Sequence, residues 1–221
     1  MSDDEGKKQL LWRADAAQSG DAGGAGDIGS HLIFQTYFVT GLPIVAVKNA
    51  AREFLVQGKT HKNEAGEDVQ STDDRASCML VLEGGVNIQL HVCQWAEGRG
   101  NNNRTEFWSD VGTFSWNLSE NTEYLWHIIT KLVIGDFDSP LLIATDPMPT
   151  VHGDGWADAQ ARLIQWFLWN RSEQLPAGVE PFILDFLLGY NVNLVLDAIV
   201  KSANQDGATV EVPWVSDWKD L

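Results

Sequence analysis

A group of aspartates with one histidine between residues 136 and 158 has the side chains best suited to chemistry. Its members are Asp136, Asp138, Asp146, His152, Asp154 and Asp158. Carboxylates two residues apart, with a His-Gly-Asp segment nearby, can bind a divalent cation that activates water. The same aspartates also suit turns beside proline and the N-cap of a helix. The candidate metal ligands are therefore Asp136, Asp138, His152 and Asp154, and they form a site only if the fold brings them together.

Tryptophan is unusually frequent in this chain, with ten residues spread along its length. Three of them flank the polar segment EGRGNNNR, where exposed indoles would stack on a sugar ring or a base: Trp95, Trp108 and Trp116. These three could equally anchor a protein interface, and burial in the core of a sheet is the other alternative. Four others lie in apolar stretches and are candidates for a protein interface: Trp12, Trp156, Trp166 and Trp169.

Two cysteines and a histidine form a third group. A two-residue turn at Gly84-Gly85 would place Cys78, His91 and Cys93 on one face of a hairpin. Thiolates and imidazoles are ordinary zinc ligands, and a cysteine beside a histidine can act as a nucleophile. The spacing matches no short zinc motif, however, and free cysteine often packs like a small apolar residue. In this register the two sulfurs are diagonal neighbours, too far apart for a disulfide, so we predict two free thiols.

The net charge of −16 over 221 residues limits the classes of partner. It repels a phosphate backbone, and no basic patch offsets it, so we predict no nucleic-acid partner. It suits solubility or binding to a basic protein. The N-terminus, MSDDEGKK, has no basic flank before an apolar run, so we expect a cytoplasmic protein, or a particle assembled in the cytoplasm. We expect no phosphate-binding glycine loop, and no cofactor other than a divalent cation at the acids described above.

The clearest local pattern is a hairpin over residues 76–95, in which apolar and polar residues alternate from Val86 to Cys93. Other β-branched and aromatic stretches predict strands over 31–39, 105–118 and 140–145. The alternating segment ATVEVPWV, residues 208–215, predicts one more strand, and Pro213 confines this strand to the edge of a sheet.

Apolar residues at helical spacing predict four helices, over residues 43–57, 120–133, 156–175 and 181–203. The last two form the apolar centre of the chain. The helix over 156–175 is apolar on more than one face, so either the sheet or another subunit covers its second face. The run over 182–200 approaches the length of a membrane span, but two aspartates and two asparagines interrupt it, and we predict no stable span.

Residues 1–30 are rich in glycine, alanine and aspartate and cannot bury enough apolar surface to fold alone. They are predicted to be a flexible arm, or an arm that orders on a neighbouring subunit through Leu10–Trp12. Residues 31–221 then form one α+β domain. In that domain a mostly antiparallel sheet, with the 76–95 hairpin at its centre, packs against the four helices.

The absence of a catalytic motif, the tryptophans and the apolar helices favour a non-catalytic assembly protein. The predicted function is a homo-oligomeric structural subunit, of which a viral or phage subunit, part of a virion, is one form. Three alternatives remain open. One is an acidic inhibitor that neutralises a basic partner, and another is a metal-dependent hydrolase that uses the acids at 136–158. A membrane-active oligomer that releases the 182–200 segment is the last.

Overall fold

The computed structural model describes residues 16–55, 72–94, 96, 103–110, 112–117, 129–134, 140–144, 164, 168 and 185–220. The chain divides into two compact units, Met1–Ala96 with Asp185–Leu221, and Glu97–Leu184. Each unit contains a four-stranded sheet in which every pair of neighbouring strands is antiparallel. The prediction of a mixed α and β protein with antiparallel sheet is therefore confirmed.

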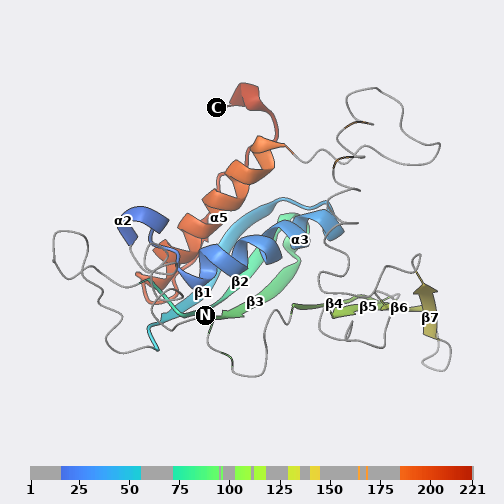
Figure 1. Ribbon diagram of the computed structural model, residues 1–221. Helices are drawn as coiled ribbons and strands as arrows, with labels where there is room; N and C mark the ends of the chain where they lie inside the picture. Colours follow the sequence, from blue (N-terminus) through green and yellow to red (C-terminus); the bar gives the residue numbers. More distant parts are fainter. Residues whose placement is uncertain are drawn as a thin grey trace. The chain divides into compact units, whose positions relative to one another are not determined.

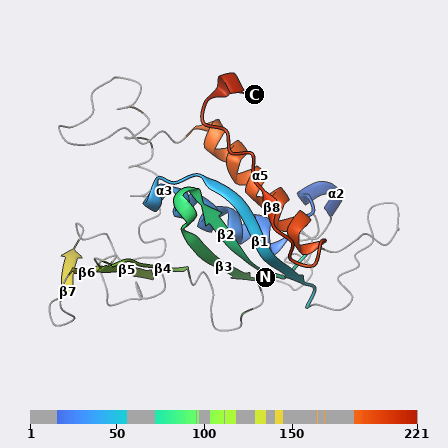
Figure 2. The ribbon, with the colours of Figure 1, turned by 180° about the vertical axis from the view of Figure 1, so that it is seen from behind.

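The sheet of the first unit has the strand order β3-β2-β1-β8. Its strands are β1 (Ile44–Glu53), β2 (Arg75–Leu82), β3 (Asn87–Cys93) and β8 (Val210–Glu211). The short strand β8 pairs with β1 at the sheet edge, as Figure 2 shows from behind. This confirms the predicted edge strand near Pro213.

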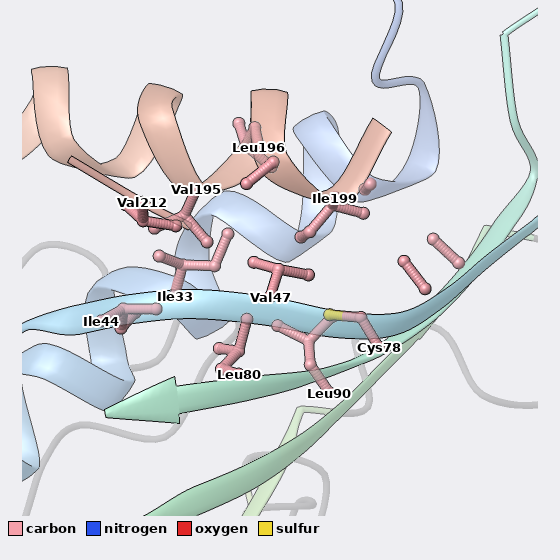
Figure 3. Packing of buried hydrophobic residues seen from close by; sticks show 14 of the residues in the cluster. Ile33, Ile44, Val47, Cys78, Leu80, Leu90, Val195, Leu196, Ile199 and Val212 are labelled. Atoms are coloured by element: carbon pink, nitrogen blue, oxygen red, sulfur yellow. The ribbon is translucent and has the colours of Figure 1, made fainter. Parts of the chain in front are cut away.

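The helices of the first unit are α2 (Ala16–Ser19), a π-helical turn η1 (Ala25–Gly29), α3 (Ser30–Thr40) and α5 (Phe186–Ala203). The described residues of this unit also form two short 3-10 turns, η2 (Glu83–Gly85) and η4 (Trp218–Asp220). Helices α3 and α5 lie against the sheet of β1, β2 and β3 (Figure 1). The core lies between them, where side chains from both helices meet alternate residues of the strands (Figure 3): Ile33, Ile44, Val47, Leu80, Leu90, Val195 and Ile199.

The predicted hairpin is present, but its register differs from the predicted one by one residue. Its turn contains three residues, Glu83–Gly85, because Leu82 and Val86 form the closing pair and the Leu82 N–H donates to the Val86 carbonyl at 2.8 Å. Gly84 and Gly85 both have positive φ, 78° and 85°, which glycine adopts at little cost. Cys78 consequently pairs with Leu90 and not with His91.

Two predicted elements have the opposite type of structure. Residues predicted as a strand over 31–39 belong to α3, and the helix predicted over 43–57 is replaced by β1, which ends at Glu53. Short apolar runs fit either type, and tertiary pairing decides between them. Here β1 pairs with β2 on one side and β8 on the other, which satisfies its backbone groups as a central strand. Gly41, with a φ of 66°, ends α3.

The predicted helix over 181–203 is confirmed from Phe186 to Ala203 as α5. Asp185 is its N-cap and accepts a hydrogen bond from the Leu188 N–H at 3.0 Å. Within the described part of the chain, α5 is the one helix long and apolar enough to cross a membrane. Its buried side chains pack onto β1 instead, so the chain's own sheet covers the apolar face of this helix.

The second unit contains the sheet β4-β5-β6-β7, formed by β4 (Arg104–Trp108), β5 (Gly112–Asn117), β6 (Ile129–Ile134) and β7 (Pro140–Ala144). The strands predicted near 105–118 and 140–145 are confirmed. The helix predicted over 120–133 is wrong from Ile129 onwards, because these residues pair with both β5 and β7. Only Ile164 and Leu168 of the helix predicted over 156–175 are described, and both are helical.

The predicted arm over residues 1–30 is described from residue 16. Its last part is folded: Ala25 is fully buried in the core, and η1 contacts β3. The prediction of a flexible arm is therefore wrong for residues 23–30, because neighbouring strands supply the burial that this segment cannot provide alone. The prediction of one domain over 31–221 remains a prediction.

Candidate functional site

Most of the residues predicted to form sites lie outside the described ranges. These are all four candidate metal ligands, Asp136, Asp138, His152 and Asp154, the four interface tryptophans, and Trp95. Trp108 is described in β4 and is 77% exposed, and Trp116 is in β5. Trp108 pairs with Thr113, whereas Trp116 pairs with Thr105. This register puts positions 108 and 116 on opposite faces of the hairpin.

The predicted grouping of Cys78, His91 and Cys93 is wrong. With Cys78 opposite Leu90, its side chain lies on the core face of the hairpin and is 4% exposed. His91 and Cys93 occupy the alternate positions of β3, on the other face. Among the residues that the structure describes, no three His, Cys, Asp or Glu side chains lie close enough together to hold a metal ion. Both cysteines are free thiols, as predicted.

A different pair of chemically active side chains lies at the start of the 24–40 helical segment. Asp27 and His31 are both exposed, and they are four residues apart across the junction of η1 and α3. Residues at this spacing lie on the same face of a helix. Asp27 lies within a π-helical turn, a rare structure that often occurs at functional sites. This face therefore presents a carboxylate and an imidazole together.

Gln94, which directly follows β3, fixes the carboxylate of this pair. Its side-chain Nε2 donates a hydrogen bond to Asp27 Oδ2 at 3.1 Å. The strand and the helical turn meet closely here, because a Cβ built on Gly29 would be 3.7 Å from Val92 Cγ1. The amide of Gln94 carries no charge, so it orients Asp27 without neutralising it.

Sequence reasoning missed this site because it assigned Asp27 to a flexible arm and His31 to a strand. The signal that reveals it is the Asp-x-x-x-His spacing, which is informative only in a helix. The sequence also contains the G-x-G-x-x-G spacing, at Gly24, Gly26 and Gly29. No strand precedes them among the described residues, however, so they lack the strand–turn–helix context of a dinucleotide-binding loop.

The arrangement is suited to proton transfer at a bound substrate. An imidazole can accept a proton from a substrate hydroxyl, and a carboxylate on the same helix face can orient it. A dinucleotide-binding fold requires parallel strands joined by crossover helices. Both described sheets are antiparallel, so the described residues do not form such a fold.

Comparison with known proteins identifies the family of this chain. A model of the GFO/IDH/MocA C-terminal domain matches residues 1–115, slightly more than half of the chain. No curated protein sequence matches.

Several solved structures have the same fold. Levoglucosan dehydrogenase in complex with NADH and levoglucosan is 24% identical, with a TM-score of 0.71 over 93% of this chain and 54% of its own. An oxidoreductase domain protein from Kribbella flavida is 20% identical, with a TM-score of 0.66, covering 91% of this chain and 54% of that one. An inositol dehydrogenase homolog from Azotobacter vinelandii, complexed with NAD+, is 16% identical, with a TM-score of 0.67, covering 92% and 52%. The chain spans about half the length of these proteins.

These findings overturn the predicted structural subunit of a homo-oligomer or virion, along with the acidic inhibitor, the hydrolase and the membrane-active oligomer. The charge and the tryptophan content, which motivated the inhibitor and the structural subunit, are bulk properties, and bulk properties do not define a site. The helix over 156–175, whose second apolar face suggested another subunit, is described only at Ile164 and Leu168. The apolar face of α5 is covered by the sheet of the same unit. The chain belongs to the GFO/IDH/MocA family, and its matched region is that family's C-terminal domain.

Proposed function

We propose that this chain provides the substrate-binding part of a nicotinamide-dependent oxidoreductase that oxidises a hydroxyl group of a sugar or polyol. Several similar structures support this substrate class. They include levoglucosan dehydrogenase with NADH and L-sorbose, and an aldose-aldose oxidoreductase from Caulobacter crescentus with glycerol. The observation that carries the proposal is the exposed Asp27 and His31 pair on one helix face.

Oxidation of an alcohol to a carbonyl removes the hydroxyl proton together with a hydride from carbon. In the proposed reaction His31 accepts the hydroxyl proton as general base. Asp27, one turn earlier, stabilises the imidazolium that forms, and Gln94 holds the carboxylate in place. The described residues do not fit a dinucleotide-binding fold, so we assign this chain the proton transfer only. A nicotinamide cofactor, when bound, would supply the hydride acceptor.

An assay of the natural protein that contains this sequence tests the proposal. Reduction of NAD+ or NADP+ is followed by absorbance with a panel of aldoses, polyols and anhydrosugars. We expect at least one of them to be oxidised. The His31→Asn variant should lose about 100-fold or more in kcat, the size of a lost general base. His91→Asn is the matched control and should retain activity. His91 is exposed on the face of β3 that points away from the core.

A second pair of variants tests the carboxylate. Asp27→Asn should lower kcat, whereas Asp197→Asn, an exposed aspartate on α5, should not. The proposal fails if no member of the panel reduces either nucleotide. It also fails if His31→Asn is as active as the unaltered protein.

Other expectations stay predictions. We propose self-association, no nucleic-acid partner, which the net charge of −16 disfavours, and a cytoplasmic location. The interface tryptophans Trp12, Trp156, Trp166 and Trp169 belong with this proposal. Light scattering after a sizing column tests it, and a monomer at every concentration would contradict it.

A further inference from the structure

We propose that Asp73 is a positioning residue. Together with Arg52, Asp73 holds η1 in the orientation that proton transfer requires. This turn carries Asp27 and leads directly into α3, which carries His31. The inference rests on the proposed function, since it assigns how the proton-transfer pair is kept in place. Its basis is a buried network of hydrogen bonds beneath this turn.

The Asp73 carboxylate is fully buried and accepts bonds at both oxygens. Oδ1 accepts from the Gly23 N–H at 2.9 Å, and Oδ2 accepts from the Ala25 N–H at 3.0 Å. The Gly24 N–H donates to the Asp73 carbonyl at 2.8 Å. The backbone N–H groups at a helix start have no partner within the helix. One residue, 48 to 50 positions away in the sequence, therefore satisfies three successive N–H groups at the start of η1.

Arg52 balances the charge of this carboxylate. Its Nε donates to Asp73 Oδ1 at 2.9 Å, and its side chain is only 10% exposed. Its Nη2 also donates to the carbonyl of Asp21, on the segment that leads into η1. A buried carboxylate without a cation is strongly unfavourable. The pair therefore fixes the approach to the turn as well as its first N–H groups.

The backbones of the two segments touch. A Cβ built on Gly23 would lie 2.5 Å from the Asp73 carbonyl oxygen and 2.5 Å from Thr72 Cβ. A Cβ on Gly24 would lie 3.1 Å from the Asp74 carbonyl oxygen. Such contact leaves no room for a side chain, so the position of η1 follows that of residues 72–74.

The same short segment also fixes the other end of Asp27. The Gln94 N–H donates to the Asp74 carbonyl at 2.9 Å, and the Gln94 side chain then bonds the Asp27 carboxylate. The Asp74 carboxylate is buried too, and accepts from the Leu55 N–H at 2.8 Å. Both the backbone and the carboxylate of Asp27 are thus tied to residues 73 and 74. Displacement of this segment would misplace the proton-transfer pair.

Asp73→Asn is the test variant, because the amide keeps its size. Its carbonyl oxygen can replace Oδ1 and keep the Gly23 and Arg52 bonds. Its NH2 group then faces the Ala25 N–H, where two donors meet. The conflict therefore falls on the turn that carries Asp27. Arg52→Lys, which keeps the cation but not the guanidinium geometry, is the second variant if Asp73→Asn does not fold.

Ser202→Ala is the matched control. Ser202 is also fully buried, and its hydroxyl donates to the Ala208 carbonyl and accepts from the Ala50 N–H, both away from η1. We expect both variants to lower Tm. Only Asp73→Asn should lower kcat, by about 10- to 100-fold with little change in KM, as misplacement of a catalytic group does. Amide hydrogen exchange at Ala25 and Asp27 should be faster in Asp73→Asn than in Ser202→Ala.

The two proposals fail in different ways. If the unaltered protein oxidises no sugar or polyol, the proposed function fails, and amide exchange still tests whether Asp73 fixes the turn. Unchanged exchange at Ala25 and Asp27 in Asp73→Asn overturns the positioning role. So does an equal loss of kcat in Ser202→Ala, since the effect would then follow stability alone.

Discussion

The side-chain amide of Gln94 donates a hydrogen bond to the Asp27 carboxylate over 3.1 Å, although 67 positions separate the two residues in the sequence. Gln94 follows β3, and Asp27 lies in the π-helical turn before α3. Through this contact the edge of the sheet orients an exposed acid on the helix. Removal of the bond should therefore affect function more than stability.

Gln94→Leu should lower kcat by about tenfold or more, because the carboxylate loses its orienting partner. Gln94→Glu should lower it further, since two carboxylates would then face each other. Gln89→Leu is the control, because Gln89 is exposed on the face of β3 that points away from the core. Steady-state kinetics and Tm of all three variants measure the effect. Equal kcat in Gln94→Leu and Gln89→Leu would contradict the assigned role.

Gly23→Ala should destabilise the fold by about 1–3 kcal/mol, the usual cost of forcing a group into a packed site. The new methyl group would lie 2.5 Å from the Asp73 carbonyl oxygen. Gly189→Ala is the matched control, since a Cβ at this exposed position, in the first turn of α5, meets nothing within 4 Å. It should stabilise the protein by about 0.5–1 kcal/mol. Urea unfolding of both variants measures the difference, and the same sign of change in both would refute the prediction.

Burial raises the pKa of the Cys78 thiol to about 12. The folded state therefore keeps the proton above pH 9, where an unfolded chain has released it. The free energy of unfolding should accordingly fall by about 1.4 kcal/mol per pH unit from pH 9 towards pH 12. This contribution is fully present below pH 9. Cys78→Ala should remove this part of the slope, as pH-dependent urea unfolding can measure.

Thiol labelling gives an independent check on Cys78. A water-soluble disulfide reagent should modify the half-buried Cys93 in the native protein, but Cys78 only after unfolding. Cys93→Ser serves as the control that isolates Cys78. Rapid native labelling of Cys93→Ser would show that Cys78 is accessible.

Asn191→Ala should destabilise the protein by about 1–3 kcal/mol, because it removes the side chain that bonds both backbone groups of the half-buried Val215. The Asn191 side chain is buried in α5, donates to the Val215 carbonyl at 2.8 Å and accepts from the Val215 N–H at 2.9 Å. Amide exchange at Val215 should become faster. Asn193→Ala, on the exposed face of the same helix, should change stability by less than about 0.5 kcal/mol. No change at Val215 in Asn191→Ala would contradict this role.

Part of the fold follows from local pattern alone. Strict alternation identifies the β2–β3 hairpin, and a long periodic run with Asp185 before it identifies α5. Alternation does not determine the turn length, and one residue in the turn moves Cys78 to the face opposite His91. The helix α3 and the strand β1 are short apolar runs whose type depends on their partners.

The candidate site depends more on the tertiary structure than the individual helices and strands do. The sequence by itself determined that the chain is acidic and of mixed α and β type with antiparallel strands, because composition and periodicity are local properties. Only the tertiary structure decided that a glycine-rich segment is folded. It did so by supplying the buried Asp73 carboxylate and the Gln94 amide from distant positions. Glycines this close together form a helix only where other residues satisfy their N–H groups and exclude water, and no local pattern contains those residues.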